Sequence, residues 1–234
     1  MAIYVIGDIH NSLIKLDGIL KQISPSYKDN IILLGDLFDR GAAEPDPVGV
    51  YFRICGLDAR VTWIRGNHDQ LLADYIYQYY GFPEKKRGSL RSYRYNSFDL
   101  MSKRLTEADM LNIADQIMKL PLQVEMEIDN INYLFAHAMT FDPSMGERED
   151  KAYLEGLGNM KEYWDKGVDG YVSLVGHTDA QYQFNNPQGR YLDEETNSIW
   201  LNNQENVYMV DCGCGLASGR LACICLETGE RFYA

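Results

Sequence analysis

The chain has 234 residues, of which 46% are hydrophobic and 24% are charged, so it can bury a core and has the composition of an ordinary globular protein. Its 34 Asp and Glu outnumber its 22 Lys and Arg, which gives a net charge of −12. Because binding to nucleic acid needs clustered Lys and Arg, this charge argues against a nucleic-acid partner. It leaves room for a local cationic pocket, above all one built by metal ions.

The amino-terminal residues and the cysteines both favour a cytoplasmic location. Residues 1–7 have no basic region and no long apolar core, so we expect no signal peptide. No run approaches the ~18 apolar residues of a membrane span, so we expect no membrane partner. The five cysteines are odd in number and are expected to be reduced thiols. Cys212/Cys214 and Cys223/Cys225 are interpreted as strand alternation, because zinc sites with strong precedent use Cys-x₂₋₄-Cys spacing.

The first third of the chain predicts a parallel, buried sheet. Apolar runs typical of buried strands occupy residues 2–6, 31–34 and 61–64. Helices are expected over residues 13–23, 48–55 and 69–80. This β-α-β-α-β-α order places the carboxyl ends of the strands at one edge, where α/β sheets bind their ligands.

The rest of the chain is less regular. Residues 81–97 are rich in Tyr, Lys and Arg and are expected to form a loop or the start of a small helical insertion. Thr106 and Asp109 resemble a capping box before a helix over 108–120. Alternating apolar residues around Asp129-Asn130 predict a hairpin. The remaining expectations are strands at 122–128, 131–136 and 171–175, a polar loop over 181–204, and a final pair of strands at 207–211 and 220–226.

All four histidines of the chain lie just past the expected strand ends. They are His10, His68, His137 and His177. Carboxylate and imidazole side chains suit divalent Mn, Fe, Zn or similar ions, and no cysteine joins the set. Six side chains could hold two ions that share one carboxylate: Asp8, His10, Asp36, Asn67, His137 and His177.

Five motifs, in order along the chain, resemble those of the calcineurin-like metallophosphoesterases. They are GDIH (7–10), GDLFDRG (35–41), RGNHD (65–69), AHA (136–138) and GHT (176–178). The intact Asp-Arg-Gly narrows the resemblance to the phosphoprotein-phosphatase branch, which includes bacterial and phage Ser/Thr phosphatases and is related to diadenosine tetraphosphate hydrolases. The implied fold is α/β, a β-sandwich of two mixed sheets flanked by helices. We expect a single domain over 1–234, with a small helical insertion around 81–120 as an option.

The resemblance implies two divalent metal ions. Asp8 and His10 would hold the first ion, Asp36 would bridge, and the second ion would be held by Asn67, His137 and His177. Mn is the expected metal, with Fe, Zn, Ni and Co as alternatives.

The resemblance also implies catalytic and phosphate-binding roles. His68 would be the general acid that protonates the leaving oxygen, Asp39 would hydrogen-bond it and keep it cationic, and Arg40 would grip the phosphate. Arg65 would contact the phosphate or brace its own loop. Lys166 stands where phage-type enzymes have a phosphate-binding arginine, but a lysine lacks the bidentate fork, and Arg148 is another candidate.

The leading functional hypothesis is a metal-dependent phosphatase acting on phosphoserine or phosphothreonine in proteins, or on small phosphoesters. A metal-bound hydroxide would attack phosphorus directly. Symmetrical hydrolysis of diadenosine polyphosphates is the alternative, although those enzymes commonly lack the aspartate at position 39. A non-catalytic metal- or phosphopeptide-binding module is the third hypothesis, and the His68/Asp39 pair argues against it.

Specificity is expected to lie in the irregular stretches 81–104 and 140–164. Four residues of the first stretch could stack on or grip a substrate, or could simply belong to a surface loop: Arg91, Tyr93, Arg94 and Tyr95. The sequence leaves the oligomeric state open.

Overall fold

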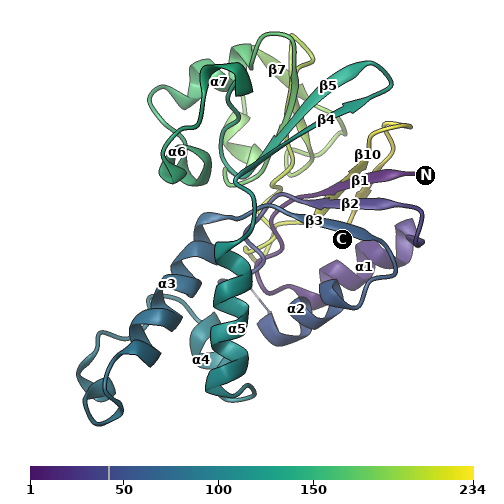
Figure 1. Cartoon of the computed structure of the whole chain (residues 1–234). Helices are drawn as coiled ribbons and strands as arrows, with labels where there is room; N and C mark the ends of the chain where they lie inside the picture. Colours follow the sequence, from purple (N-terminus) through teal and green to yellow (C-terminus); the bar gives the residue numbers. More distant parts are fainter. Residues whose placement is uncertain (42) are drawn as a thin grey trace.

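The computed structural model describes residues 1–41 and 43–234, and its strands form two mixed sheets with helices on their outer sides (Figure 1). Apolar residues of both sheets meet in one buried cluster, in which Val5 and Ile32 of the first sheet join Phe135 and Leu174 of the second. The two sheets therefore pack face to face as a sandwich. This arrangement confirms the expected α/β fold class.

The first sheet has the strand order β11-β10-β1-β2-β3. Its strands are β1 (Ile3–Ile6), β2 (Asn30–Leu33), β3 (Arg60–Trp63), β10 (Ala222–Cys225) and β11 (Arg231–Tyr233). Strands β1, β2 and β3 are parallel, as the order of the elements predicts, and β10 joins β1 in the antiparallel direction. The carboxyl ends of the three parallel strands consequently lie at the same edge of the sheet.

The second sheet has the strand order β4-β5-β6-β9-β8-β7. Its strands are β4 (Gln123–Ile128), β5 (Ile131–Ala136), β6 (Val172–Val175), β7 (Gly189–Tyr191), β8 (Trp200–Asn202) and β9 (Val207–Met209). Strands β4 and β5 form the expected hairpin, and both turn residues, Asp129 and Asn130, are left-handed with φ of 51° and 63°. A two-residue turn of this kind matches the twist of the flanking strands.

The carboxyl-terminal third contains the main departures from the predicted elements. Strands β7 and β8 lie within residues 181–204, which the sequence predicts to be a loop. Each is only three residues long and is stabilised by its neighbours in the sheet, so local pattern carries little signal. Both strands of the expected final pair are present, as β9 and β10, but β9 lies in the second sheet and β10 in the first.

Helices cover the outer faces of the sandwich and extend beyond it (Figure 1). They are α1 (Leu13–Ile23), α2 (Pro47–Cys55), α3 (Asn67–Gly81), α4 (Ser97–Met101), α5 (Glu107–Met118), α6 (Asp150–Glu155) and α7 (Met160–Lys166), with 3₁₀ turns η1 (Glu84–Ser89), η2 (Pro143–Met145) and η3 (Ala180–Gln183). Helices α1 and α2 pack on the first sheet, whereas α3, η1, α4 and α5 form a lobe that projects from its edge. The expected capping box starts α5: the Asp109 N–H donates to Thr106 Oγ1 at 3.2 Å, and the Thr106 N–H donates to Asp109 Oδ2 at 3.0 Å.

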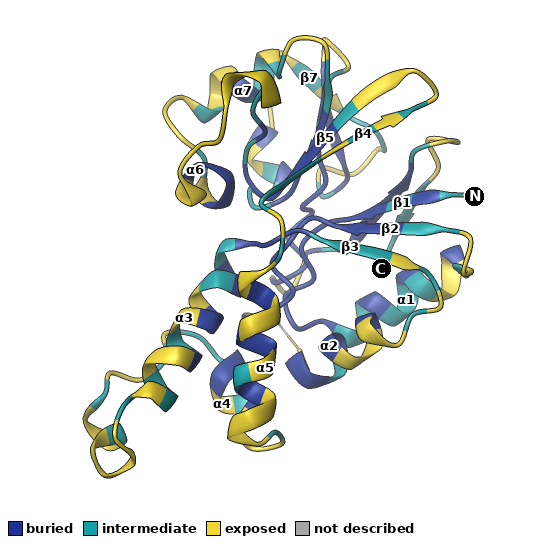
Figure 2. Cartoon of the chain, in the orientation of Figure 1, coloured by how far each residue is buried: buried dark blue, intermediate teal, exposed yellow. Residues whose placement is uncertain are grey.

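The loops that follow β1 and β2 are buried at the centre of the molecule (Figure 2). Along β1, Ile3 and Val5 face the other sheet, whereas Tyr4 and Ile6 face the helices, so the strand is covered on both sides. The four cysteines of the two Cys-x-Cys pairs are free and buried in the core. Among the helices that the structure describes, none combines the length and the apolar character needed to cross a bilayer.

Candidate dinuclear metal and catalytic site

The predicted metal ligands converge between the edges of the two sheets. Asp8 and His10 follow β1, Asp36 follows β2, Asn67 begins α3, and His137 and His177 follow β5 and β6. The backbone of two glycines comes very close to these ligands, because a Cβ on Gly66 would collide with Asp36 and one on Gly176 would collide with Asp8. The glycines in GNH and GHT are therefore required for the ligands to approach each other.

The loops that carry the site have an unusual backbone conformation. Five non-glycine site residues are left-handed: His10 (φ 48°), Asp36 (50°), Asp39 (67°), Arg40 (58°) and His177 (63°). Such residues are uncommon and cost free energy, so they persist only where the surrounding structure holds them. Their concentration in three short loops supports this edge of the sandwich as the candidate functional site.

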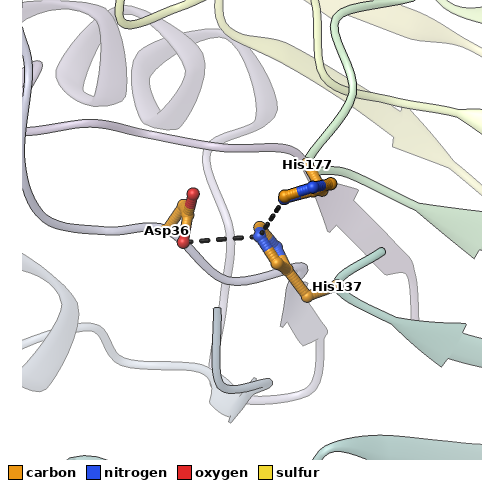
Figure 3. Close-up of side chains that lie close together, drawn as sticks. All are labelled: Asp36, His137 and His177. Carbon is orange, nitrogen blue, oxygen red and sulfur yellow. Dashed lines mark hydrogen bonds and ion pairs between the residues drawn. The ribbon is translucent and has the colours of Figure 1, made fainter. Parts of the chain in front are cut away.

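One set of donor atoms joins Asp36, Asn67, His137 and His177. His137 Nε2 lies 2.8 Å from Asn67 Oδ1, 3.2 Å from His177 Nδ1 and 3.4 Å from Asp36 Oδ1. Figure 3 shows Asp36, His137 and His177 pointing toward one another from three different loops. Four electron-rich atoms directed at one point match the ligand set of a divalent ion.

A second set of donor atoms shares Asp36 with the first. His10 Nε2 lies 3.8 Å from Asp8 Oδ2 and 3.8 Å from Asp36 Oδ2. The Asp8, His10 and Asp36 ligand atoms all lie within 4.8 Å of one another, as do those of Asp36, His137 and His177. One carboxylate common to two clusters is the arrangement that two neighbouring ions need.

Backbone carbonyls orient two of the imidazoles as metal ligands. His10 Nδ1 lies 3.1 Å from the Phe38 carbonyl oxygen, and His137 Nδ1 lies 2.8 Å from that of Leu34. Each Nδ1–H can donate to its carbonyl, which leaves Nε2 as the ring atom directed at Asp36. Ligating histidines usually have such a partner on the second nitrogen, so the residues present fit a metal centre.

The electrostatics of the buried site also suit bound cations. Burial lowers the pKa of His10 and His177 to about 4, so both rings are neutral at pH 7, the form that binds metal. Burial, and then Asp211, raise the pKa of Asp8 well above its usual range. Burial would lower the pKa of His137, but the neighbouring Asp36 carboxylate raises it to about 10. The site thus favours positive charge beside Asp36.

His68 and Asp39 form a buried pair beside the two donor sets. His68 Nδ1 lies 3.0 Å from Asp39 Oδ2, and the two side chains are almost completely buried. The Asp39 carboxylate also accepts hydrogen bonds from the Tyr93 phenol at 2.6 Å and the Ser97 N–H at 3.2 Å. The His68 ring packs against Tyr95 with 4.4 Å between ring centres and 58° between the ring planes. Asp39 thereby holds His68 through Nδ1, so Nε2 is the ring nitrogen that can serve another partner.

The model of one protein family matches residues 1–210 and is described as calcineurin-like phosphoesterase. The chain belongs to this family. A symmetrical bis(5'-nucleosyl)-tetraphosphatase of Pectobacterium carotovorum is 32% identical over 193 residues, which are 74% of this chain and 62% of that protein. The chain therefore spans less than two thirds of the length of this relative.

One further relative and one solved structure of similar fold are protein phosphatases. A protein phosphatase 2A catalytic subunit of Dictyostelium discoideum is 28% identical over 101 residues, covering 42% of this chain and 32% of that protein. A solved protein serine/threonine phosphatase from Saccharomyces cerevisiae has a TM-score of 0.59 at 15% identity, and the match covers 98% of this chain and 73% of that one. The structural likeness shows a common fold.

Arg40 is the predicted phosphate-binding residue that faces the site. Its Nη1 lies 3.3 Å from His10 Nε2, and its side chain is exposed. Together with His10 and His177 it lines a cavity of about 660 Å³. A guanidinium in this position can reach an anion in the cavity, as the phosphate-binding role requires.

Arg65 takes the bracing position. It is 6% exposed, and its guanidinium donates to Gln70 Oε1 at 2.8 Å and to Asp150 Oδ2 at 3.1 Å. These contacts tie the RGNHD loop to α3 and α6. Of the two roles considered for Arg65, the structure favours that of a brace.

Lys166 and Arg148 lie outside the cavity of the metal ligands. The Lys166 ammonium is paired with Glu162 at 2.7 Å along α7. Both basic residues line a separate cavity of about 430 Å³, together with Thr140 and Glu162. The structure therefore gives no support to a phosphate contact by Lys166, because α7 packs on the far side of the second sheet.

Asp69, to which the motif resemblance assigns no role, has a structural one. Its buried carboxylate accepts hydrogen bonds from four N–H groups: those of Asp36 (3.1 Å), Leu37 (2.9 Å), Gly66 (2.9 Å) and the Trp63 indole (3.2 Å). It thus holds the loop of the shared carboxylate against the start of α3. Its place two residues after Asn67, at a helix start, is the sequence signal that could have revealed this role.

Proposed function

We propose that the protein is a cytoplasmic phosphatase that uses two divalent metal ions, Mn²⁺ in the first instance, to hydrolyse phosphomonoesters, with phosphoserine or phosphothreonine of proteins as the substrate group. The observation that carries this proposal is the His68–Asp39 pair, 3.0 Å apart, beside two donor sets that share Asp36. A protein that only bound metal or phosphate would not need a positioned proton donor at this place.

Under this proposal, metal binding, proton donation and phosphate binding fall to different residues of the site. Asp8, His10, Asp36, Asn67, His137 and His177 would hold the ions. Divalent cations there activate water and offset negative charge on the phosphoryl group. His68 Nε2 would donate a proton to the leaving oxygen, with Nδ1 held by Asp39. Arg40 would bind and orient the phosphoryl oxygens from the open side of the cavity.

Symmetrical hydrolysis of dinucleoside tetraphosphates is a second candidate. It is favoured by the 32% identity to the Pectobacterium enzyme. It is disfavoured by the cavity beside the metal ligands. Asp179 and Asp211 line that cavity, and Arg40 is its only arginine or lysine in the described part of the chain. A chain of four phosphates would place several negative charges against these two carboxylates.

A substrate panel tests the proposal. The metal-free protein would be supplied with Mn²⁺, Fe²⁺, Zn²⁺, Ni²⁺ or Co²⁺ and assayed with phosphoserine peptides, p-nitrophenyl phosphate and diadenosine tetraphosphate. We expect a higher kcat/KM for the monoesters than for the dinucleotide. Cleavage of diadenosine tetraphosphate alone would establish the second candidate, and binding of metal without hydrolysis of any compound would indicate a binding module.

A further inference from the structure

The segment 84–104 concentrates positive charge on an otherwise acidic protein. It carries seven of the 22 Lys and Arg of the chain but only two of the 34 Asp and Glu. Arg87 and Arg104 are paired with Glu107 and Asp46. The other five are exposed and have no ion-pair partner among residues 1–41 and 43–234: Lys85, Lys86, Arg91, Arg94 and Lys103.

Ring contacts connect this basic segment to the proton donor. The Tyr95 ring packs at a tilt against His68 with 4.4 Å between ring centres, and the Arg94 guanidinium lies 5.3 Å from the centre of the Tyr95 ring. Two residues earlier along the chain, Tyr93 donates its phenol hydrogen to Asp39 at 2.6 Å. The segment thus contacts both members of the His68–Asp39 pair. The Tyr95 ring lies between Arg94 and the proposed proton donor, His68.

Arg91 and Arg94 of this segment line one open cavity between α3 and the segment. Its volume is about 720 Å³, and Arg91 and Arg94 line it together with Leu71, Tyr75 and Tyr93. Asp74 is the one acidic residue on its wall in the described part of the chain, and its Oδ1 already accepts a hydrogen bond from Gln70 at 3.0 Å. Two unpaired cations beside aromatic rings favour an anionic occupant.

We propose that Arg91 and Arg94 form a subsite for an acidic side chain of a phosphopeptide substrate, two or three residues from the phosphorylated residue. The inference rests on the proposed function, in which His68 faces the leaving group, so that groups beyond His68 meet the rest of the substrate chain. The 4.4 Å and 5.3 Å steps from His68 to Arg94 correspond to two or three residues of extended peptide, at about 3.3 Å per residue.

The geometry favours a peptide over a nucleotide as the source of the negative charge. A second phosphate joined to the scissile one shares an oxygen with it. It would therefore lie against Arg40 and the metal ligands and would not reach Arg94. An acidic side chain on an extended peptide can cross Tyr95 and enter the cavity.

Single charge reversals test the proposal in the metal-loaded enzyme. Two phosphoserine peptides of equal length would carry either Glu or Gln at the second and third positions on both sides of the phosphoserine. We expect kcat/KM of the wild type to be roughly three- to tenfold higher for the Glu peptide, as befits one or two exposed ion pairs. Arg91→Glu and Arg94→Glu should each lower this ratio toward one or below, mainly through KM.

A matched control separates a local contact from net charge. Lys28→Glu makes the same change in net charge, but Lys28 is exposed and precedes β2, at the opposite end of the strand from Asp36. We expect this variant to keep the wild-type ratio. The preference for the Glu peptide should also shrink as ionic strength rises, because salt screens exposed charges.

Three results would overturn the proposal. They are equal rates of the wild type on the two peptides, an unchanged ratio in both arginine variants, and the same loss in Lys28→Glu as in Arg94→Glu. If the arginine variants were impaired only on diadenosine tetraphosphate, the anionic group would belong to a nucleotide and the peptide subsite would be wrong. Failure of the proposed function is distinct, since the wild type would then not hydrolyse p-nitrophenyl phosphate or either peptide.

Discussion

At the scale of single residues, the proposed metal ligands and the proposed proton donor make separate contacts. Asp36 lies in both donor sets, whereas His68 joins neither and instead contacts Asp39 at 3.0 Å. Neighbouring residues in the sequence, Asn67 and His68, therefore point into different parts of the site. This separation allows a variant to impair one function and leave the other intact.

Replacement of His68 by Asn should remove the proton donor and spare the metal ligands. We expect kcat to fall by roughly 10²–10⁴-fold, the usual contribution of general acid catalysis. Metal content, measured by inductively coupled plasma mass spectrometry, should equal that of the wild type. Loss of metal from this variant would show that His68 is a ligand.

Tyr93→Phe should have a smaller effect through the position of Asp39. Burial and then Asp39 raise the pKa of the Tyr93 phenol, so it keeps its proton and can donate to the carboxylate. Hydrogen bonds to charged groups contribute about 1.5–3 kcal/mol, so we expect kcat to fall by roughly tenfold or more with little change in KM. A wild-type kcat would mean that the remaining contacts of Asp39 suffice to hold it.

At the scale of elements, the start of α3 is secured by a buried carboxylate rather than by exposed capping groups. Asp69 accepts four N–H hydrogen bonds, whereas Asp109, at the equivalent place in α5, is exposed and accepts hydrogen bonds from Thr106. Asp69 caps a helix and also holds the loop of Asp36, whereas Asp109 caps a helix. The two residues can therefore be compared directly.

Asp69→Asn should destabilise the protein far more than Asp109→Asn. An amide at position 69 would direct N–H groups at backbone donors, and a buried unsatisfied polar group costs about 1–3 kcal/mol. Urea unfolding of both variants measures the difference. Equal midpoints for the two would contradict the bracing role of Asp69.

Asp29, in the turn before β2, is expected to make a pH-dependent contribution to stability. Hydrogen bonds from Ala2 N–H and then from Ser26 lower the pKa of Asp29 to about 2. The pKa of Asp29 is lower in the folded chain than in the unfolded chain. Its contribution to the free energy of unfolding is therefore complete above the unfolded pKa and is lost as pH falls through about 2. Asp29→Asn should therefore lower Tm at pH 6 and have a much smaller effect near pH 2. A difference in Tm that did not shrink on acidification would be inconsistent with this origin.

At the scale of the whole molecule, the sequence predicts the parts that depend on local pattern. Apolar runs followed by Gly-Asp or Gly-His place the ligands at strand ends, and the parallel order of β1, β2 and β3 brings those ends together. The contact of Tyr93 with Asp39 joins residues 54 positions apart and follows from the packing of the lobe. The position of Lys166 could not be predicted from the sequence for a similar reason, because the distance of Lys166 from the site depends on how α7 packs.

Removal of metal should lower the stability of the folded chain, because the donor sets are assembled only on folding. A ligand present at 100 times its dissociation constant adds about 2.7 kcal/mol to the free energy of unfolding. We expect EDTA to lower Tm, and Mn²⁺ in excess of the chelator to restore it. A Tm that is the same with and without chelator would argue against a bound metal.

A calorimetric titration with Mn²⁺ of the metal-free wild type and of Asp36→Asn tests the shared-carboxylate site most directly. The predicted result is two ions per chain for the wild type, with p-nitrophenyl phosphate hydrolysis reaching its maximum at the second equivalent. Asp36→Asn should lose high-affinity binding of both ions, together with hydrolysis, and remain folded by circular dichroism. Binding of one ion by the active wild type, or of two ions by Asp36→Asn at wild-type affinity, would contradict the dinuclear site.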